Sequence, residues 1–287
     1  MFDQRGQHPV RALCRALHIA PSGYYEWLRR SESDRAREDR RLLVHVRAAY
    51  ARSYGTYGVR RLHAELADEG LGIGRDRVRR LMRQAGLEAK PRRRRTSWPT
   101  ARLSALDVPN VLARRFTVSR PDEVWVADTT EFATGEGTLY LAAVIDLYAR
   151  RVVGWSASSS MHRSLAIDAL TKALHARGDV SGVLHHSDQG SQYTSADYRA
   201  LLDRHGARAS YSGRGQCLDN AVAESFFGTL KDELVHRTRF ATHAEARRAL
   251  ARYVEVFYTH QRRPSALKYR TPAAHEAAYH RAAAQAA

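Results

Sequence analysis

The chain has 287 residues, 44% of them hydrophobic, and a formal net charge of +17. This length suggests two or three modules with enough apolar residues to bury a core. No apolar run reaches the roughly 18 residues of a membrane span, and the first residues, MFDQRGQHPV, lack the apolar stretch of a secretory signal. The two cysteines, Cys14 and Cys217, exclude a disulfide framework and a four-cysteine zinc site, and they fit a reducing cytoplasm.

The positive charge is concentrated in the first third of the chain. Residues 1–100 hold 23 Lys and Arg against 11 Asp and Glu, a balance of +12, whereas residues 101–287 hold 24 against 19, a balance of +5. The natural partner of such a segment is a polyanion, and nucleic acid is the commonest one. The simpler alternative is a soluble basic protein or one associated with the ribosome.

Residues 1–32 are predicted to form a helix-turn-helix-like segment. Val10, Leu13 and Leu17 repeat at helical spacing, the stretch Pro-Ser-Gly at 21–23 breaks the pattern, and a second short helix follows. Two short helices around a tight turn outline a helix-turn-helix, although an ordinary helical hairpin has the same pattern.

Residues 33–90 are predicted to form a helical DNA-binding domain. A charged amphipathic helix covers 34–51, and two further helices flank a glycine-rich turn at 70–74, the second of them ending at Gly86. That second helix is crowded with arginines, as expected of a recognition helix in a DNA groove, although a solvated helix face would look the same. Its candidate DNA contacts are Arg75, Arg77, Arg79 and Arg80.

Residues 91–119 are predicted to be a basic linker. The run that opens it combines proline with like charges, which argues against packing. We expect it to lie on DNA phosphates. Its candidate contacts are Arg92, Arg93, Arg94 and Arg95.

The pattern of the sequence changes at about residue 120, and residues 120–240 are predicted to form an α/β core. Three strands come first, at 122–132, 138–147 and 150–158, and helices then alternate with short strands up to a long helix beginning near Asn220. Such an order implies a mixed sheet with helices on its faces. The remainder, 241–287, is predicted to be helical.

Three carboxylates stand at unusual places in this core. Asp128 lies within an apolar strand, Asp188 ends another strand, and Glu224 lies on the first turns of the long helix. A buried carboxylate without a partner is costly, and carboxylate oxygens are ligands for hard divalent cations. Two such ions about 4 Å apart can hold the attacking and leaving oxygens of a phosphodiester exchange. A single Asp would more often be a cap or a satisfied hydrogen bond, but three acids on two strands and a helix predict a metal site.

The long helix adds a basic residue to this pattern. Lys231 lies seven residues after Glu224, on nearly the same helix face and about 10 Å further along the axis. Val222, Phe226, Leu230 and Leu234 form the opposite, core-facing stripe. A phosphate backbone running from the metals along the helix would meet Lys231, although a solvated helix face would also explain the pattern.

With these residues in place, the chain resembles the integrase-core transposases of the IS-three family of bacterial insertion sequences. SYGTYGVRRLHAEL and RVRRLMRQAGL are similar to the family's helical domain. VWVADTT, HHSDQGSQYTS and DNAVAESFFGTLKDEL are similar to its three acidic motifs, and YTHQRRPSALKYRTP to its C-terminal motif. The likeness covers nearly the whole chain.

The resemblance implies an RNase-H-like core and a DDE transposase. Asp128, Asp188 and Glu224 would be its catalytic metal ligands, for two Mg²⁺ ions that Mn²⁺ could replace, and Lys231 would contact DNA. The enzyme would nick the element ends by hydrolysis, and a 3′ hydroxyl would then attack target DNA without a covalent enzyme intermediate. The C-terminal motif usually has Asn, His and Gly where this chain has Thr259, Pro264 and Lys268.

The resemblance also implies partners. These are the double-stranded DNA of the element ends and of the target, further copies of the chain assembled on that DNA, and an upstream-frame DNA-binding protein or a fusion with it. No membrane partner is expected, and the location would be the bacterial cytoplasm at the nucleoid. From the residues alone, two alternatives stay open: an RNase-H-like nuclease that cuts without joining, and a non-enzymatic DNA-binding regulator using residues 1–95.

Overall fold

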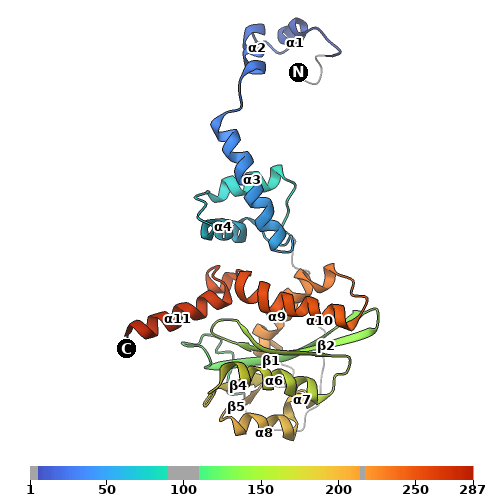
Figure 1. The fold of residues 1–287 in the computed structure, drawn as a ribbon, viewed down its shortest axis with the longest axis vertical. Coiled ribbons are helices and arrows are strands. Elements are labelled where there is room, and N and C mark those ends of the chain that lie inside the picture. The colour runs from blue at the N-terminus through green and yellow to red at the C-terminus, as the bar shows by residue number, and fades with distance from the viewer. Residues whose placement is uncertain (1–5, 90–109, 214–216, 287) are drawn as a thin grey trace.

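The computed structural model describes residues 6–89, 110–213 and 217–286. Figure 1 shows three parts in succession along its long axis: a pair of short N-terminal helices, a small helical domain, and a core built around a β-sheet. The predicted basic contacts at Arg92, Arg93, Arg94 and Arg95 lie outside the described residues. Within the described residues, no helix is long and apolar enough to cross a membrane.

The N-terminal pair consists of α1 (Val10–Ala16) and α2 (Pro21–Arg29). The prediction that Pro21 interrupts the helical pattern is wrong at this residue, because Pro21 is the first residue of α2. Proline fits the first helical position, where its missing N–H would have no intrahelical partner and its fixed φ suits a helix.

The helical domain contains α3 (Asp34–Arg52), α4 (Val59–Asp68) and α5 (Arg75–Gln84), close to the predicted bounds. Ser33 caps α3 by accepting a hydrogen bond from the N–H of Ala36. Gly70 and Gly86, each with a positive φ, follow α4 and α5 where the chain turns. The core of this domain is closed to solvent, with these side chains fully buried: Val46, Leu62, Leu66, Val78 and Leu81.

The core contains one five-stranded sheet in the order β3-β2-β1-β4-β5. Its strands are β1 (Val124–Thr134), β2 (Gly137–Asp146), β3 (Val152–Ser158), β4 (Leu184–Ser187) and β5 (Arg208–Tyr211). The pairs β1–β2 and β2–β3 are antiparallel, whereas β1–β4 and β4–β5 are parallel. The predicted α/β, RNase-H-like mixed sheet is therefore confirmed.

Helices cover both faces of this sheet (Figure 1). On one face lie α6 (Arg163–Arg177), α7 (Ser191–Thr194) and α8 (Ala196–Arg204), whose buried side chains share one apolar cluster with Trp125 of β1. On the other lies α9 (Ala221–Glu233), which packs on Val126. Trp125 is completely buried and is therefore a core residue. The short helix α7 was not predicted.

The C-terminal region is helical, as predicted. It contains α10 (His243–Ala251), a π-helical stretch (Arg252–Gln261), a 3₁₀ turn (Ser265–Leu267) and α11 (Pro272–Ala286). Ahead of the sheet, residues 110–119 lie against the core, where Leu112 is buried and the N–H groups of Val111 and Leu112 donate to the hydroxyl of Ser210. The end of the predicted linker therefore packs on the core.

Candidate catalytic site

The sheet register brings two of the three predicted acids together. On the parallel strands β1 and β4, Val124 pairs with Leu184 and Val126 with His186. Two residues further along each strand come Asp128 and Asp188, the latter directly after the end of β4. Neighbouring strands lie about 4.8 Å apart, and residues two apart share a face. Both carboxylates thus stand at the carboxyl end of these strands, with the parity of Val126 and Leu184, which face α9.

Tyr193 on α7 lies close to the strand ends that carry the two acids. Its hydroxyl is 2.9 Å from that of Thr129, the neighbour of Asp128. Burial raises the pKa of Tyr193 well above its usual value, and the negative charges of Asp128 and Asp188 add to that rise. The phenol therefore stays neutral, and its hydroxyl lies within the field of both acids. Sequence reasoning did not single out Tyr193.

Gly190, two residues after Asp188, lies close to that carboxylate. The Asp188 Oδ1 accepts a hydrogen bond of 3.0 Å from the N–H of Gly190. A Cβ added to Gly190 would lie 2.8 Å from that same oxygen and 2.5 Å from the side-chain nitrogen of Gln192. A larger residue at this position would force the side chains of Asp188 and Gln192 to move, so the small size of Gly190 helps to keep the carboxylate oriented at the end of its strand.

Glu224 lies on α9, the helix that packs against β1. The start of α9 is held to β1 by Asn220, whose amide donates a 3.0 Å hydrogen bond to the carbonyl of Ala127, next to Asp128. Glu224 lies in the first turn of α9 and is partly exposed, whereas Ala223 and Phe227 beside it are buried in the core. The helix therefore presents Glu224 on its less buried side.

The oxygen chemistry here fits a hard divalent cation. Besides the carboxylates, the amide oxygen of Asn220 is a possible ligand. It is buried and has no hydrogen-bond partner within the described residues. Across those residues, however, no three His, Cys, Asp or Glu side chains already form a group able to hold a metal. Carboxylates that approach one another repel until a cation neutralises them, so three acids around one site would favour binding of such an ion.

Lys231 lies on α9 seven residues after Glu224, and both side chains are partly exposed. In the predicted opposite stripe, Phe226, Leu230 and Leu234 are buried and Val222 is partly buried against the core, which confirms the predicted core-facing side of this helix.

The arginines predicted to contact DNA from α5 separate into two pairs. Arg77 donates to Glu38 and Asp39 at 2.8 Å each, and Arg80 donates to Asp39 at 2.6 Å. These two side chains therefore turn back toward α3. Arg75 and Arg79 are exposed on a different side of the helix. The spacing along one helix could not reveal carboxylate partners about 40 residues upstream.

The adjacent histidines before Asp188 point to opposite sides of β4, as their spacing predicts. His185 is hydrogen-bonded to the hydroxyl of Tyr198, and His186 to the hydroxyls of Ser210 and Ser212. Burial lowers the pKa of His185 to about 3 and that of His186 to about 4. Both rings are neutral at pH 7 and stabilise the strands next to the acids.

The three departures in the C-terminal motif differ in their consequences. Thr259 is buried and donates to the carbonyl of Val254. Pro264 accepts hydrogen bonds through its carbonyl from the N–H groups of Leu267 and Tyr269. Lys268 has a φ of 52°, a left-handed conformation that favours glycine. Thr259 and Pro264 fit their surroundings, whereas Lys268 is strained.

Comparisons with known families match the helical domain, the core and part of the C-terminal region. A model described as an integrase core domain matches residues 118–217, and another with the same description matches residues 205–272. A model described as an HTH-like domain matches residues 36–95.

Known proteins match nearly the whole chain. It is 40% identical over 264 residues to the transposase InsF for insertion sequence IS3A of Escherichia coli (strain K12), covering 91% of each chain. It is 38% identical to the transposase for insertion sequence element IS629 of Shigella sonnei, covering 96% of this chain and 94% of that one. Among solved structures, the HTLV-2 integrase catalytic core domain in complex with magnesium is similar over 53% of this chain and 95% of that one, with 14% identity and a TM-score of 0.40.

Proposed function

The chain belongs to the insertion-sequence transposases with an integrase core, and we propose that Asp128, Asp188 and Glu224 are the catalytic carboxylates of this DNA strand-transfer enzyme. The observation that carries the proposal is the parallel register of β1 and β4, which brings Asp128 beside Asp188 on the face that α9 covers. The third acid, Glu224, lies on the first turn of that helix.

The three carboxylates would hold two Mg²⁺ ions, or Mn²⁺ in their place, which when bound stabilise the attacking and leaving oxygens of a phosphodiester. In the first step, the oxygen of a water attacks the phosphorus at the element end, and the bond to the 3′ oxygen breaks to leave a 3′ hydroxyl. In the second step, this hydroxyl attacks a target phosphodiester and releases a 3′ hydroxyl of the target. Neither step forms a covalent bond to the protein.

The remaining groups would position either the substrate or the three acids. Lys231, on the same helix as Glu224, would hold a phosphate as the DNA backbone leaves the metals. Tyr193 and Asn220 would fix the strand ends and the start of α9, and so the spacing of the acids.

The integrase core and the HTH-like domain imply DNA as the partner. We propose that the DNA comprises the insertion-sequence ends and the target, that several copies of the chain assemble on it, and that an upstream-frame DNA-binding protein or a fusion with it contributes to end recognition. The protein would then act at the nucleoid, in the bacterial cytoplasm.

The test is strand transfer with labelled oligonucleotides in Mg²⁺ or Mn²⁺, beside a thermal melt of each variant. Asp128→Asn, Asp188→Asn and Glu224→Gln should each abolish nicking and joining while retaining the melt and the binding of DNA. Combining them should add no further loss, because the site fails as a unit. Asp203→Asn, which removes an exposed carboxylate from α8, is the matched control. A lowered melt with substantial residual activity would overturn the assignment.

Lys231→Ala provides a second test on the same helix. It should slow joining more than it weakens the binding of DNA, because a phosphate contact next to the reacting bond fixes register more than it supplies affinity. Joining rates and dissociation constants are measured on one substrate. Equal losses in both would assign Lys231 a simple affinity role.

A further inference from the structure

A polar groove lies where the helical domain meets the C-terminal region. Its volume is about 660 Å³. One side is formed by the starts of α4 and α5 together with Ala89, and the other by Ser265 and Tyr269 of the C-terminal region. Four arginines line it, namely Arg60, Arg61, Arg75 and Arg79. We call this site the arginine groove.

The arginine groove carries an excess of positive charge. The acidic side chain in its lining, Asp76, pairs with Arg79 at 2.5 Å. Arg60 and Arg75 are exposed, and no salt bridge within the described parts of the chain involves either of them. Two guanidinium groups at the rim are thus available to an anion.

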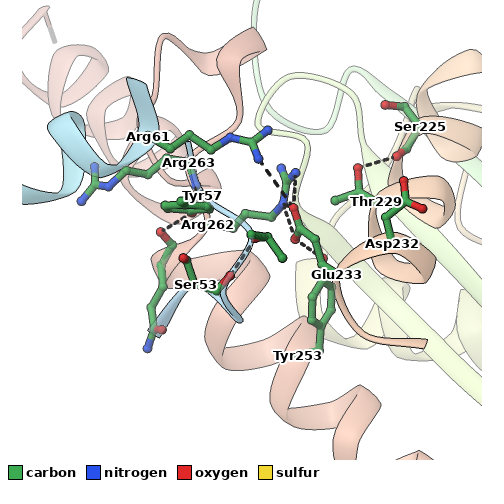
Figure 2. A network of polar contacts seen from close by, with 12 residues as sticks. Ser53, Tyr57, Arg61, Ser225, Thr229, Asp232, Glu233, Tyr253, Arg262 and Arg263 are labelled. Carbon is green, nitrogen blue, oxygen red and sulfur yellow. Dashed lines mark hydrogen bonds and ion pairs between the residues drawn. The ribbon is translucent and has the colours of Figure 1, made fainter. Parts of the chain in front are cut away.

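A third excess charge lies deeper, at Arg61. Its nitrogen is 3.7 Å from the Glu233 carboxylate, but that carboxylate already accepts three hydrogen bonds of 2.9–3.1 Å from Arg262 (Figure 2). Two guanidinium groups therefore share one carboxylate. Burial and the neighbouring positive charge of Arg262 lower the pKa of Arg61, which is the direction expected of an incompletely neutralised cation.

The backbone at the arginine groove also favours an anion. Gly58 and Gly74 precede α4 and α5 as N-cap residues, and neither helix start has a side-chain cap. The first N–H groups of a helix have no intrahelical partner and carry partial positive charge. Gly58, Arg75 and Asp76 all line the arginine groove, so both helix starts open into it.

We propose that the arginine groove binds the phosphate backbone of duplex DNA, with Arg61 as the inner contact and Arg60, Arg75 and Arg79 at the rim. The inference rests on the proposed function in one respect, that DNA is the substrate. It adds that the C-terminal region forms one wall of the site. DNA bound there lies at a fixed distance from the catalytic core, because the same region is bonded to both parts of the protein.

Two neighbouring arginines provide those bonds. Arg262 pairs with Glu233 at the end of α9, as described above. Arg263 pairs with Glu65 and Asp68 of α4 at 2.7 Å each, and its N–H donates to the hydroxyl of Tyr57 at 2.8 Å. The arginine groove therefore exists only while the helical domain is docked on the C-terminal region.

The first experiment measures the salt dependence of binding by the full chain to a short duplex of unrelated sequence, without divalent metal. For Arg60→Gln/Arg75→Gln, the slope of log affinity against log salt should become less steep by about 1.8, or about 0.9 for each lost phosphate contact. Arg204→Gln, which removes an exposed charge from α8 on the far side of the sheet, should leave the slope unchanged. Identical slopes for the unchanged protein, the double variant and Arg204→Gln would overturn the proposal.

The second experiment tests the C-terminal wall. Ser265→Asp places a negative charge on that wall and should reduce affinity for the duplex at least several-fold, whereas Ser265→Asn, of similar size but neutral, should bind as the unchanged protein does. Equal affinities for the two variants would remove the C-terminal region from the site. Since these assays contain no metal, their failure leaves the assignment of the three acids intact. In turn, loss of joining in the acid variants does not change the conclusion about DNA binding by the arginine groove.

Discussion

Removing the Arg262 guanidinium should strongly destabilise the protein. Arg262 and Glu233 each have 7% of the side chain exposed, and three hydrogen bonds join them. In Arg262→Met, the apolar side chain fills much of the space but leaves Glu233 buried with its main partner gone. Glu233 keeps the hydroxyl of Tyr253 at 2.7 Å and Arg61 at 3.7 Å.

The expected magnitude follows from these contacts. Removing one partner of a buried ion pair costs about 3–5 kcal/mol, mostly because the other charge stays buried and unpaired. Since Tyr253 and Arg61 still contact Glu233, we expect the lower end, a loss of about 3 kcal/mol in the free energy of unfolding. Arg262→Met/Glu233→Leu, which removes both charges, should be more stable than Arg262→Met.

The assay is urea unfolding followed by far-UV circular dichroism and tryptophan fluorescence together, because coincident transitions establish that the unfolding is cooperative. Arg270→Met, an exposed position in the same region, is the matched control and should change the free energy of unfolding by less than about 0.5 kcal/mol. A loss below about 1 kcal/mol for Arg262→Met, or a double variant less stable than the single one, would refute the reasoning.

Three further predictions concern other parts of the fold. Gly154→Ala should cost about 2 kcal/mol or more in a thermal melt, because its Cβ would lie 2.2 Å from the Ala169 carbonyl oxygen and 2.6 Å from the Ala173 nitrogen on α6; a cost under about 0.5 kcal/mol would contradict that packing. Lys268→Gly should stabilise the protein by about 0.5–1 kcal/mol in the same assay by relieving the left-handed φ of 52°, and a lower melt would show that the lysine side chain outweighs the strain. His185 has a folded pKa of about 3, below its unfolded value, so the unfolded chain binds the proton first and the protein should lose stability as the pH falls from about 6.5 toward 3. Urea unfolding of His185→Gln should show a weaker loss over that range, and parallel losses in the two proteins would contradict a buried neutral ring.

The parts predicted well from the sequence are those governed by local apolar periodicity. The strands around Asp128 and Asp188 and the helix carrying Glu224 follow from runs and stripes of apolar residues, which the sheet and the core of α9 retain. Their order along the chain was enough to predict a mixed sheet. The short helix α7, with four residues, is too brief to show such periodicity.

The parts that could not be predicted depend on contacts between distant elements. Arg77 and Arg80 look identical in spacing to Arg75 and Arg79, yet they turn toward Glu38 and Asp39 on another helix. Likewise, nothing in the spacing of Arg262 indicates that it enters the core to meet Glu233, 29 residues away. Charged side chains are long and can pair in several directions, so their partners depend on the tertiary fold.

The packing of residues 110–114 on the core determines how the protein can be divided into fragments. Asp219, with 1% of its side chain exposed, accepts hydrogen bonds from Asn110, Arg114 and the N–H of Gly213. A truncation at the predicted core boundary, residue 120, would strip away Asn110, Leu112 and Arg114 and leave a buried carboxylate with two of these partners missing. That carboxylate is next to Asn220, which ties α9 to β1. An isolated catalytic domain intended for crystallisation or assays should therefore start before Asn110, because the first stabilising contacts of the core come from what the sequence suggests is linker.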